Sequence, residues 1–148
     1  MAFQYRMDQI IDYKNHEKDR THKEFLEKQT HFEEIGYELF SLLKKKEVLL
    51  EEQAKRIQDG AQINTIQSLS RYIHRLEEQE RGLQKRLQQA RNQMDTTQDL
   101  LLEQTIDVKK YEKLRKRQFE KYQHEIKMDE TKHTDELAVL RYSFNENR

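Results

Sequence analysis

The sequence contains no proline, no cysteine and no tryptophan, and only three glycines among its 148 residues. Without proline, no residue forces a helix to end, so a single helix can be very long. Without cysteine, there is neither a disulfide framework nor a thiolate metal site. No run approaches the roughly 20 apolar residues that span a bilayer, and residues 1–14 mix charged with apolar side chains, unlike a secretory signal. These absences predict a mature, helical chain in a reducing, cytoplasmic compartment.

The composition argues against a compact globular domain. Only 34% of the residues are hydrophobic and 38% are charged, which is too little apolar surface for a globular core. The 28 basic and 28 acidic residues balance, whereas disordered chains usually carry a high net charge. From Ile66 to Tyr122, apolar residues recur mostly at alternating steps of three and four. This spacing predicts an all-α protein built from a long coiled coil.

One short segment contains the signals of a turn. Gly60 lies within residues 59–65, where turn residues replace helix formers. We therefore predict two long helices that form an antiparallel coiled-coil hairpin, with the second helix longer than the first. The expected organisation is a single coiled-coil domain over 1–148, with helix 1 at about 2–58, the hairpin at about 59–65 and helix 2 at about 66–144.

The residue types near the turn and the apolar spacing also predict how the second helix starts and where the glycines lie. The side chain of Asn64 or Thr65 is expected to cap the second helix by accepting hydrogen bonds from its first amides. Gly60 is the expected hinge. Gly36 and Gly82 fall in strongly periodic stretches and are expected inside helices, each at a cost of about 1 kcal/mol relative to alanine.

A hairpin centred near residue 61 predicts that facing residues have numbers that sum to about 122. The rule joins apolar residues: Leu49 with Ile73, Leu39 with Leu83, Ile35 with Leu87, and Ile11 with Tyr111. It sets large against small where Phe32 meets Ala90 and Phe25 meets Thr97. It also leaves imperfect layers: Leu42 with Glu80, Lys28 with Met94, and Lys18 with Gln104. The predicted seam is therefore weaker than an ideal one.

The second helix is expected to extend beyond its partner after about residue 122. Apolar residues in this extension lie beyond the predicted reach of the first helix, and two aromatic residues lie near its base. Apolar residues that the first helix does not cover indicate a docking site. The residues are Leu137, Val139, Leu140, Tyr142 and Phe144, with Phe3 and Tyr5 at the base.

The sequence offers no constellation for catalysis or for a cofactor. Glu130 with His133, and Asp19 with His22, have the spacing of metal ligands, but a carboxylate-bridged metal bundle needs four helices with inward carboxylates. There is no phosphate-binding glycine loop and no His-Glu-x-x-His motif. The sequence predicts a protein that is not an enzyme and that binds neither metal nor cofactor.

A basic stripe runs along the second helix. Its residues are Lys109, Lys110, Lys113, Lys116, Arg117 and Lys121. A nucleic-acid interface would fit such a stripe, but the chain is neutral overall, Glu112 and Glu120 are interspersed, and a basic-zipper protein places its basic region before a strong leucine seam. The stripe predicts a solvated face or a contact with an acidic protein partner, and no nucleic acid.

Three stretches together resemble the FliJ family of flagellar type III export proteins, over nearly the whole chain. The first looks like the aromatic, leucine-rich start of that family, the second like its hairpin and second-helix entry, and the third like a later helical motif. The stretches are Phe3-Gln4-Tyr5-Arg6-Met7 with Ile10-Ile11-Asp12-Tyr13-Lys14 and Glu17, then Gly60 to Leu76, then Val108-Lys109-Lys110-Tyr111-Glu112-Lys113-Leu114. One departure is that Arg20 and Thr21 replace small residues usual in the family.

The resemblance implies a cytoplasmic coiled coil that acts as the central stalk of a hexameric flagellar export ATPase, similar to the gamma subunit of rotary ATP synthases. It implies contacts with the cytoplasmic domain of the export gate membrane protein and with export chaperones, and a peripheral position at the inner face of the cell membrane. The end that enters the ring would contain Phe3, Tyr5, Leu137, Leu140, Tyr142 and Phe144. A passive coiled-coil scaffold and the equivalent stalk of a virulence secretion system are the alternatives.

Overall fold

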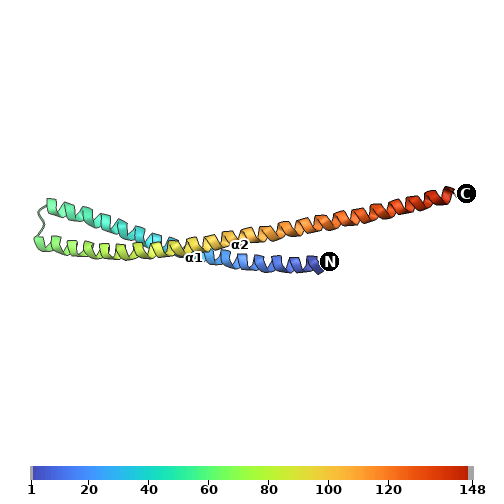
Figure 1. The fold of residues 1–148 in the computed structure, drawn as a ribbon. Helices are drawn as coiled ribbons and strands as arrows, with labels where there is room; N and C mark the ends of the chain where they lie inside the picture. Colours follow the sequence, from blue (N-terminus) through green and yellow to red (C-terminus); the bar gives the residue numbers. More distant parts are fainter. Residues whose placement is uncertain (1, 147–148) are drawn as a thin grey trace. The chain divides into compact units, whose positions relative to one another are not determined.

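A computed structural model describes residues 2–146 of the backbone and the side chains of residues 6–146. Two helices account for nearly all of them: α1 (Ala2–Gln58) and the longer α2 (Ile63–Glu146) (Figure 1). No strand occurs in this described part. The predicted all-α hairpin of two antiparallel helices, with the second longer, is confirmed.

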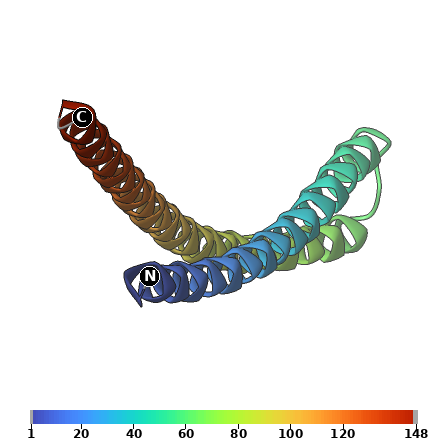
Figure 2. The same ribbon diagram turned by 90° about the vertical axis from the view of Figure 1, so that its right-hand side faces the viewer.

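The turn between the helices owes its shape to one glycine. Gly60 has a φ of 78°, the left-handed conformation that glycine adopts without steric cost. The Ala61 N–H donates to the Arg56 carbonyl at 2.9 Å, and the Gly60 N–H donates to the Ile57 carbonyl at 3.3 Å. This pair of bonds is a Schellman motif, which satisfies the last carbonyls of α1 and ends the helix. The connection is visible in Figure 2.

The second helix begins earlier than its predicted start at Ile66. The amides of Thr65 and Ile66 both donate to the carbonyl of Gln62, at 3.1 and 3.2 Å. Gln62 is therefore the residue that precedes the first turn, and Asn64 already lies inside α2. The predicted side-chain cap at Asn64 or Thr65 is wrong, because a backbone carbonyl upstream of both residues accepts the first helical bonds.

The described chain divides into two compact units. Residues 18–103 form one unit, and the described parts of 1–17 and 104–148 form the other. Both helices contribute residues to each unit. The expectation of a single domain over 1–148 stays a prediction.

In the unit of residues 18–103, the two helices meet along a seam that follows the predicted register. Gln53 donates a hydrogen bond to Ser70 at 2.6 Å, and Lys46 lies 3.7 Å from Glu77. The numbers in each pair sum to 123, so the predicted sum of about 122 is confirmed here. The most buried side chains of this seam come from both helices: Thr21, Ile35, Ile73, Leu76, Ala90 and Thr97. The prediction of small residues opposite Phe32 and Phe25 agrees with the burial of Ala90 and Thr97.

In the second unit, the same register places the start of α1 against the middle of α2. Asp8 accepts a hydrogen bond from Arg115 at 2.9 Å, and Lys14 pairs with Asp107. Met7, Ile11 and Val108 are the buried apolar residues beside these pairs. The pairs sum to 123 and 121, so the register is confirmed in this unit as well.

Candidate partner-binding surfaces

The seam itself contains charged residues that are matched across the helices. In the unit of residues 18–103, Lys46 Nζ lies 3.0 Å from a Glu80 carboxylate oxygen and 3.7 Å from Glu77. The Lys46 ammonium donates a hydrogen bond to the Glu80 carboxylate, which raises the pKa of Lys46 above its ordinary value. Glu80, which the sequence placed opposite Leu42, therefore takes its partner from the next turn of α1. This match favours the observed register, because a shifted pairing would leave a half-buried charge without its counterpart.

A second lysine plays the same part in the other unit. Lys14 donates a hydrogen bond to Asp107, which raises the pKa of Lys14, and its Nζ lies 4.7 Å from the centre of the Tyr111 ring. A cation over an aromatic face is attracted by the ring quadrupole. The charged side chains of the seam thus pair with each other across the two helices, which leaves their charged groups engaged within the chain. The surfaces available for partners lie elsewhere.

One continuous exposed surface is the last part of α2. Every described residue from Glu112 to Glu146 is exposed in this chain. At ~1.5 Å per residue, this stretch is about 50 Å long. Arg115 contacts Asp8 near the start of α1, which begins at Ala2, so in this unit α2 continues past the start of its partner (Figure 1). The prediction that the second helix outruns the first is confirmed.

Helix geometry divides the predicted ring-contact residues between faces. At ~100° per residue, Leu137, Leu140 and Phe144 fall within an arc of about 60°. Their exposed fractions are 47%, 65% and 64%. Tyr142 points about 160° away from Leu140, although it borders a shallow surface hollow together with Leu137. The side chains of Phe3 and Tyr5 lie outside those that the structure describes.

Sequence reasoning missed the residues that extend this face toward the paired part of α2. Phe119, Tyr122 and Ile126 fall on the same arc and are exposed by 43%, 41% and 39%. Their three- and four-residue spacing was the available signal. We define the C-terminal face by its apolar members: Phe119, Tyr122, Ile126, Leu137, Leu140 and Phe144. It continues the side of α2 that carries the buried Val108 in the seam.

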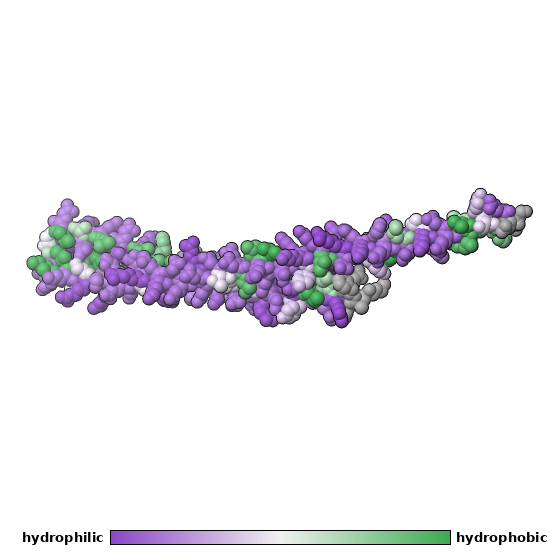
Figure 3. All heavy atoms as spheres, viewed as in Figure 1, coloured by the Kyte–Doolittle hydropathy of each residue, from purple (hydrophilic) through white to green (hydrophobic). Residues whose placement is uncertain are grey.

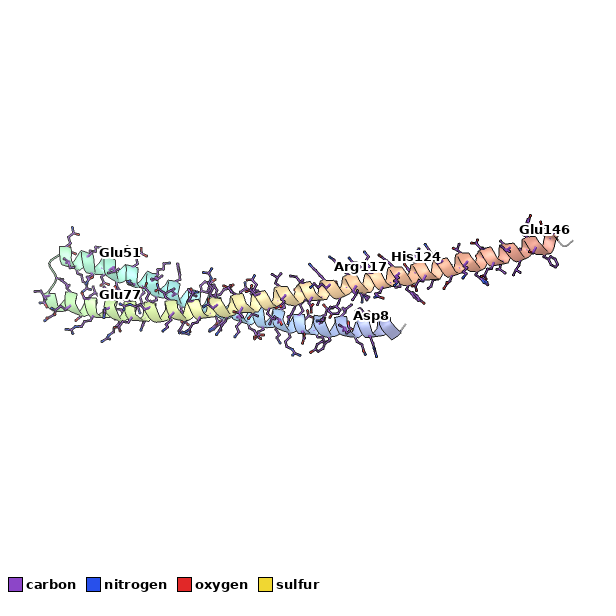
Figure 4. All side chains as sticks on the ribbon, viewed as in Figure 1. Asp8, Glu51, Glu77, Arg117, His124 and Glu146 are labelled. Atoms are coloured by element: carbon purple, nitrogen blue, oxygen red, sulfur yellow. The ribbon has the colours of Figure 1, made fainter. Side chains whose placement is uncertain are left out.

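All six residues of the basic stripe are exposed, and they share one side of α2. They fall within an arc of about 140° that faces away from the seam. Arg117 marks the stripe in Figure 4, and His124 lies just beyond it. Glu120 lies within the arc, while Arg115 lies on the seam side, where it pairs with Asp8. The arrangement presents a mostly basic outer side behind an apolar C-terminal face.

Three other features concern metal binding, membrane crossing and the turn. Among the side chains from residue 6 to 146, no three or more His, Asp or Glu residues gather where they could hold a metal ion. Within that same range, neither helix has a stretch with the length and apolar character needed to cross a bilayer. Gly60 lies in the turn as predicted, and its role as a hinge stays a prediction.

Comparison with known proteins gives a consistent result. A family model described as the flagellar FliJ protein matches residues 3–147. A flagellar FliJ protein from Bacillus subtilis (strain 168) is 30% identical over 142 residues, which cover 96% of this chain and 97% of the relative. No solved structure matches.

Proposed function

The chain belongs to the FliJ family of flagellar export-associated proteins, and from this membership we propose that it is the non-enzymatic coupling stalk of the flagellar export ATPase. In this proposal, it binds the hexameric ATPase and promotes ATP-driven protein export. The observation that carries the proposal is the C-terminal face, whose apolar residues are exposed over the last part of α2. Large exposed apolar surfaces on soluble proteins mark interaction sites.

The coupling would be allosteric rather than chemical. A hexamer has several equivalent subunits, whereas a single helix presents a different side to each of them. If the C-terminal face binds one subunit conformation more tightly than another, it shifts the conformational equilibrium by that difference in affinity. The stalk would therefore change the ATPase cycle without binding nucleotide itself.

The basic stripe would supply the electrostatic part of the contact. Its outward orientation leaves Lys113 and Lys116 exposed for acidic groups on the ATPase. Exposed charge pairs contribute only about 0 to 1 kcal/mol each, and salt screens them. The apolar contacts of the C-terminal face should therefore dominate affinity, while the stripe speeds association and orients the complex.

Two further partners belong to the same proposal. The chain would contact the cytoplasmic domain of the export gate membrane protein and would bind export chaperones. It would act in the cytoplasm, peripherally associated with the inner face of the cell membrane through the export apparatus. The family membership supports this setting.

The deciding experiment measures how the chain stimulates the ATP hydrolysis of the purified export ATPase. Deletion of residues 131–148 should leave a folded helical hairpin and abolish stimulation. A matched pair tests the face itself: Leu140→Asp should abolish stimulation, whereas Val139→Asp should leave it nearly unchanged. Val139 is exposed by 64% and Leu140 by 65%, but the two residues point about 100° apart on α2. Full stimulation by the truncated chain would place the contact elsewhere, at the Gly60 turn first.

The basic stripe is tested separately. Lys113→Glu with Lys116→Glu should weaken stimulation at low salt and have little effect at high salt, because screening already removes long-range attraction there. An equal loss at both salt concentrations would indicate that these lysines make close, buried contacts instead.

A further inference from the structure

The first helix carries a second apolar row that α2 does not cover. Its members recur at steps of three and four between residues 40 and 57. We call this row the outer seam: Phe40, Leu43, Glu47, Leu50, Ala54 and Ile57. Phe40, Leu43, Leu50 and Ile57 are exposed by 62%, 39%, 43% and 56%. Figure 3 shows hydrophobic side chains gathered at this end of the hairpin.

The outer seam has the geometry of a helix-packing surface. The seam toward α2 runs through residues 39, 42, 46, 49 and 53, and the outer seam lies about 100° further round α1. A heptad-spaced apolar row of this kind receives the side chains of one more helix. The corresponding row of α2 is polar after its first residue, because Ile63 is followed by Gln67, Ser70 and His74. Before Gly36, Glu33 and Gln29 interrupt the row along α1, and its next apolar member is Leu26.

We propose that the outer seam pairs, antiparallel, with the outer seam of a second copy of this chain. In an antiparallel pair related by a two-fold axis, facing outer-seam residues have numbers that sum to 97. Phe40 then faces Ile57 of the second copy, Leu43 faces Ala54, and Glu47 faces Leu50. Leu43 and Ala54 match large with small. The row is therefore complementary to a second copy of itself. A helix of unrelated sequence would need a matching row of its own to pack here.

The charges beside the outer seam fit the same pairing. Lys44 and Glu51 occupy the next positions round α1, and both are exposed. Lys44 Nζ lies 5.6 Å from the centre of the Phe40 ring, at the edge of the row. Seven residues separate Lys44 from Glu51 along one helix, so the two are about 10 Å apart in one copy. The two-fold pairing brings Lys44 of each copy opposite Glu51 of the other. Flanking charges of this kind set the choice and orientation of coiled-coil partners.

Glu47 limits the strength of this association. It is the ionisable member of an otherwise apolar row, and pairing would place it against Leu50 of the second copy. Desolvating a carboxylate beside an apolar side chain opposes association. The pairing should therefore be weak and concentration-dependent. The outer seam contains none of the residues proposed for the ATPase contact. The dimer proposal and the ATPase proposal can therefore be tested independently.

The first test measures the mass of the full chain by sedimentation equilibrium over a wide concentration range. The unaltered chain should associate to a dimer, and Glu47→Leu should lower the dimer Kd at least about tenfold, because it replaces a desolvated carboxylate with an apolar side chain. Glu38→Leu is the matched control on the opposite side of α1, and it should leave Kd unchanged. The proposal would be overturned if both the unaltered chain and the Glu47→Leu variant stayed monomeric at every concentration.

The second test separates a second copy from any other partner. Lys44→Glu and Glu51→Lys should each raise the dimer Kd about tenfold, since each change turns two symmetry-related attractions into repulsions. The chain with both changes should regain nearly the original Kd, because the pairs are restored in reverse. Helicity measured by circular dichroism should stay constant throughout. Dimerisation that is insensitive to either single change, or that is not restored in the double variant, would rule out the two-fold register.

Discussion

Two stretches of α2 share one pattern and differ in burial. Between residues 69 and 111, the positions at three- and four-residue steps are buried or half-buried, as Ile73 and Ala90 show. Beyond residue 111, Tyr122, Ile126 and Leu140 continue similar steps but are exposed by 41%, 39% and 65%. The spacing predicts which side of the helix is apolar. Whether that side is covered depends on how far the other helix reaches, and α1 begins at Ala2.

The largest expected effect comes from removing a side chain in the paired stretch. Ile35 on α1 is only 3% exposed, so Ile35→Ala should lower the free energy of unfolding by about 2 to 4 kcal/mol through lost burial and a residual cavity. Leu140→Ala, in the exposed stretch, should change it very little. Urea denaturation followed by circular dichroism measures both. Similar losses at both positions would mean that the end of α2 packs against another part of the free chain.

Two glycines provide a smaller test with opposite signs. Gly60→Ala should lower the free energy of unfolding by about 1 kcal/mol, because alanine resists the left-handed φ of 78°. Gly82→Ala should raise it by up to about 1 kcal/mol, since Gly82 lies inside α2 and a Cβ there would meet nothing within 4 Å. Thermal unfolding of the two variants beside the parent chain gives both values. The same sign for both would contradict the backbone explanation.

The smallest effect concerns the charged seam and appears only at alkaline pH. The raised pKa of Lys46 means that its contribution to stability is complete below its ordinary pKa of 10.5 and is lost as pH rises through the raised folded-state value. The parent chain should therefore lose more stability across this alkaline range than Lys46→Met. Arg56→Met is the control, because Arg56 pairs only with Glu52 on the surface of its own helix at 2.9 Å. An equal loss of stability with rising pH in all three chains would show that the charge of Lys46 does not stabilise the seam.

Much of the hairpin could be predicted because few local signals compete in this sequence. One turn segment and the regular spacing were enough to set the register, which Gln53 with Ser70 and Asp8 with Arg115 confirm. The start of α2 was missed because a helix can begin at a backbone carbonyl, and Gln62 has no side-chain signature for that role. The partner of Glu80 was missed because layer arithmetic ignores the reach of a lysine side chain.

The candidate surface was predicted in composition but only in part in its geometry. A list of apolar residues near the end of the chain does not say which share a face, and Tyr142 lies on another side of α2 from Leu140. Phe119 and Ile126 were left out because an assumed boundary near residue 122 hid the continuity of the spacing. The outer seam escaped notice for a related reason: one helix was assigned one apolar side.

The tight turn at Gly60 also determines the order in which the seam can form. Gln53 and Ser70 are 17 residues apart in sequence and Lys46 and Glu80 are 34 apart, but Lys14 and Asp107 are 93 apart and Asp8 and Arg115 are 107 apart. The entropic cost of closing a loop rises with the length of the loop, so the contacts next to the turn cost the least to form first. Folding should then proceed away from Gly60, and Asp8 and Arg115 should meet last and separate first. The pairs that open most readily are therefore those beside the exposed part of α2, where a binding partner could compete for them.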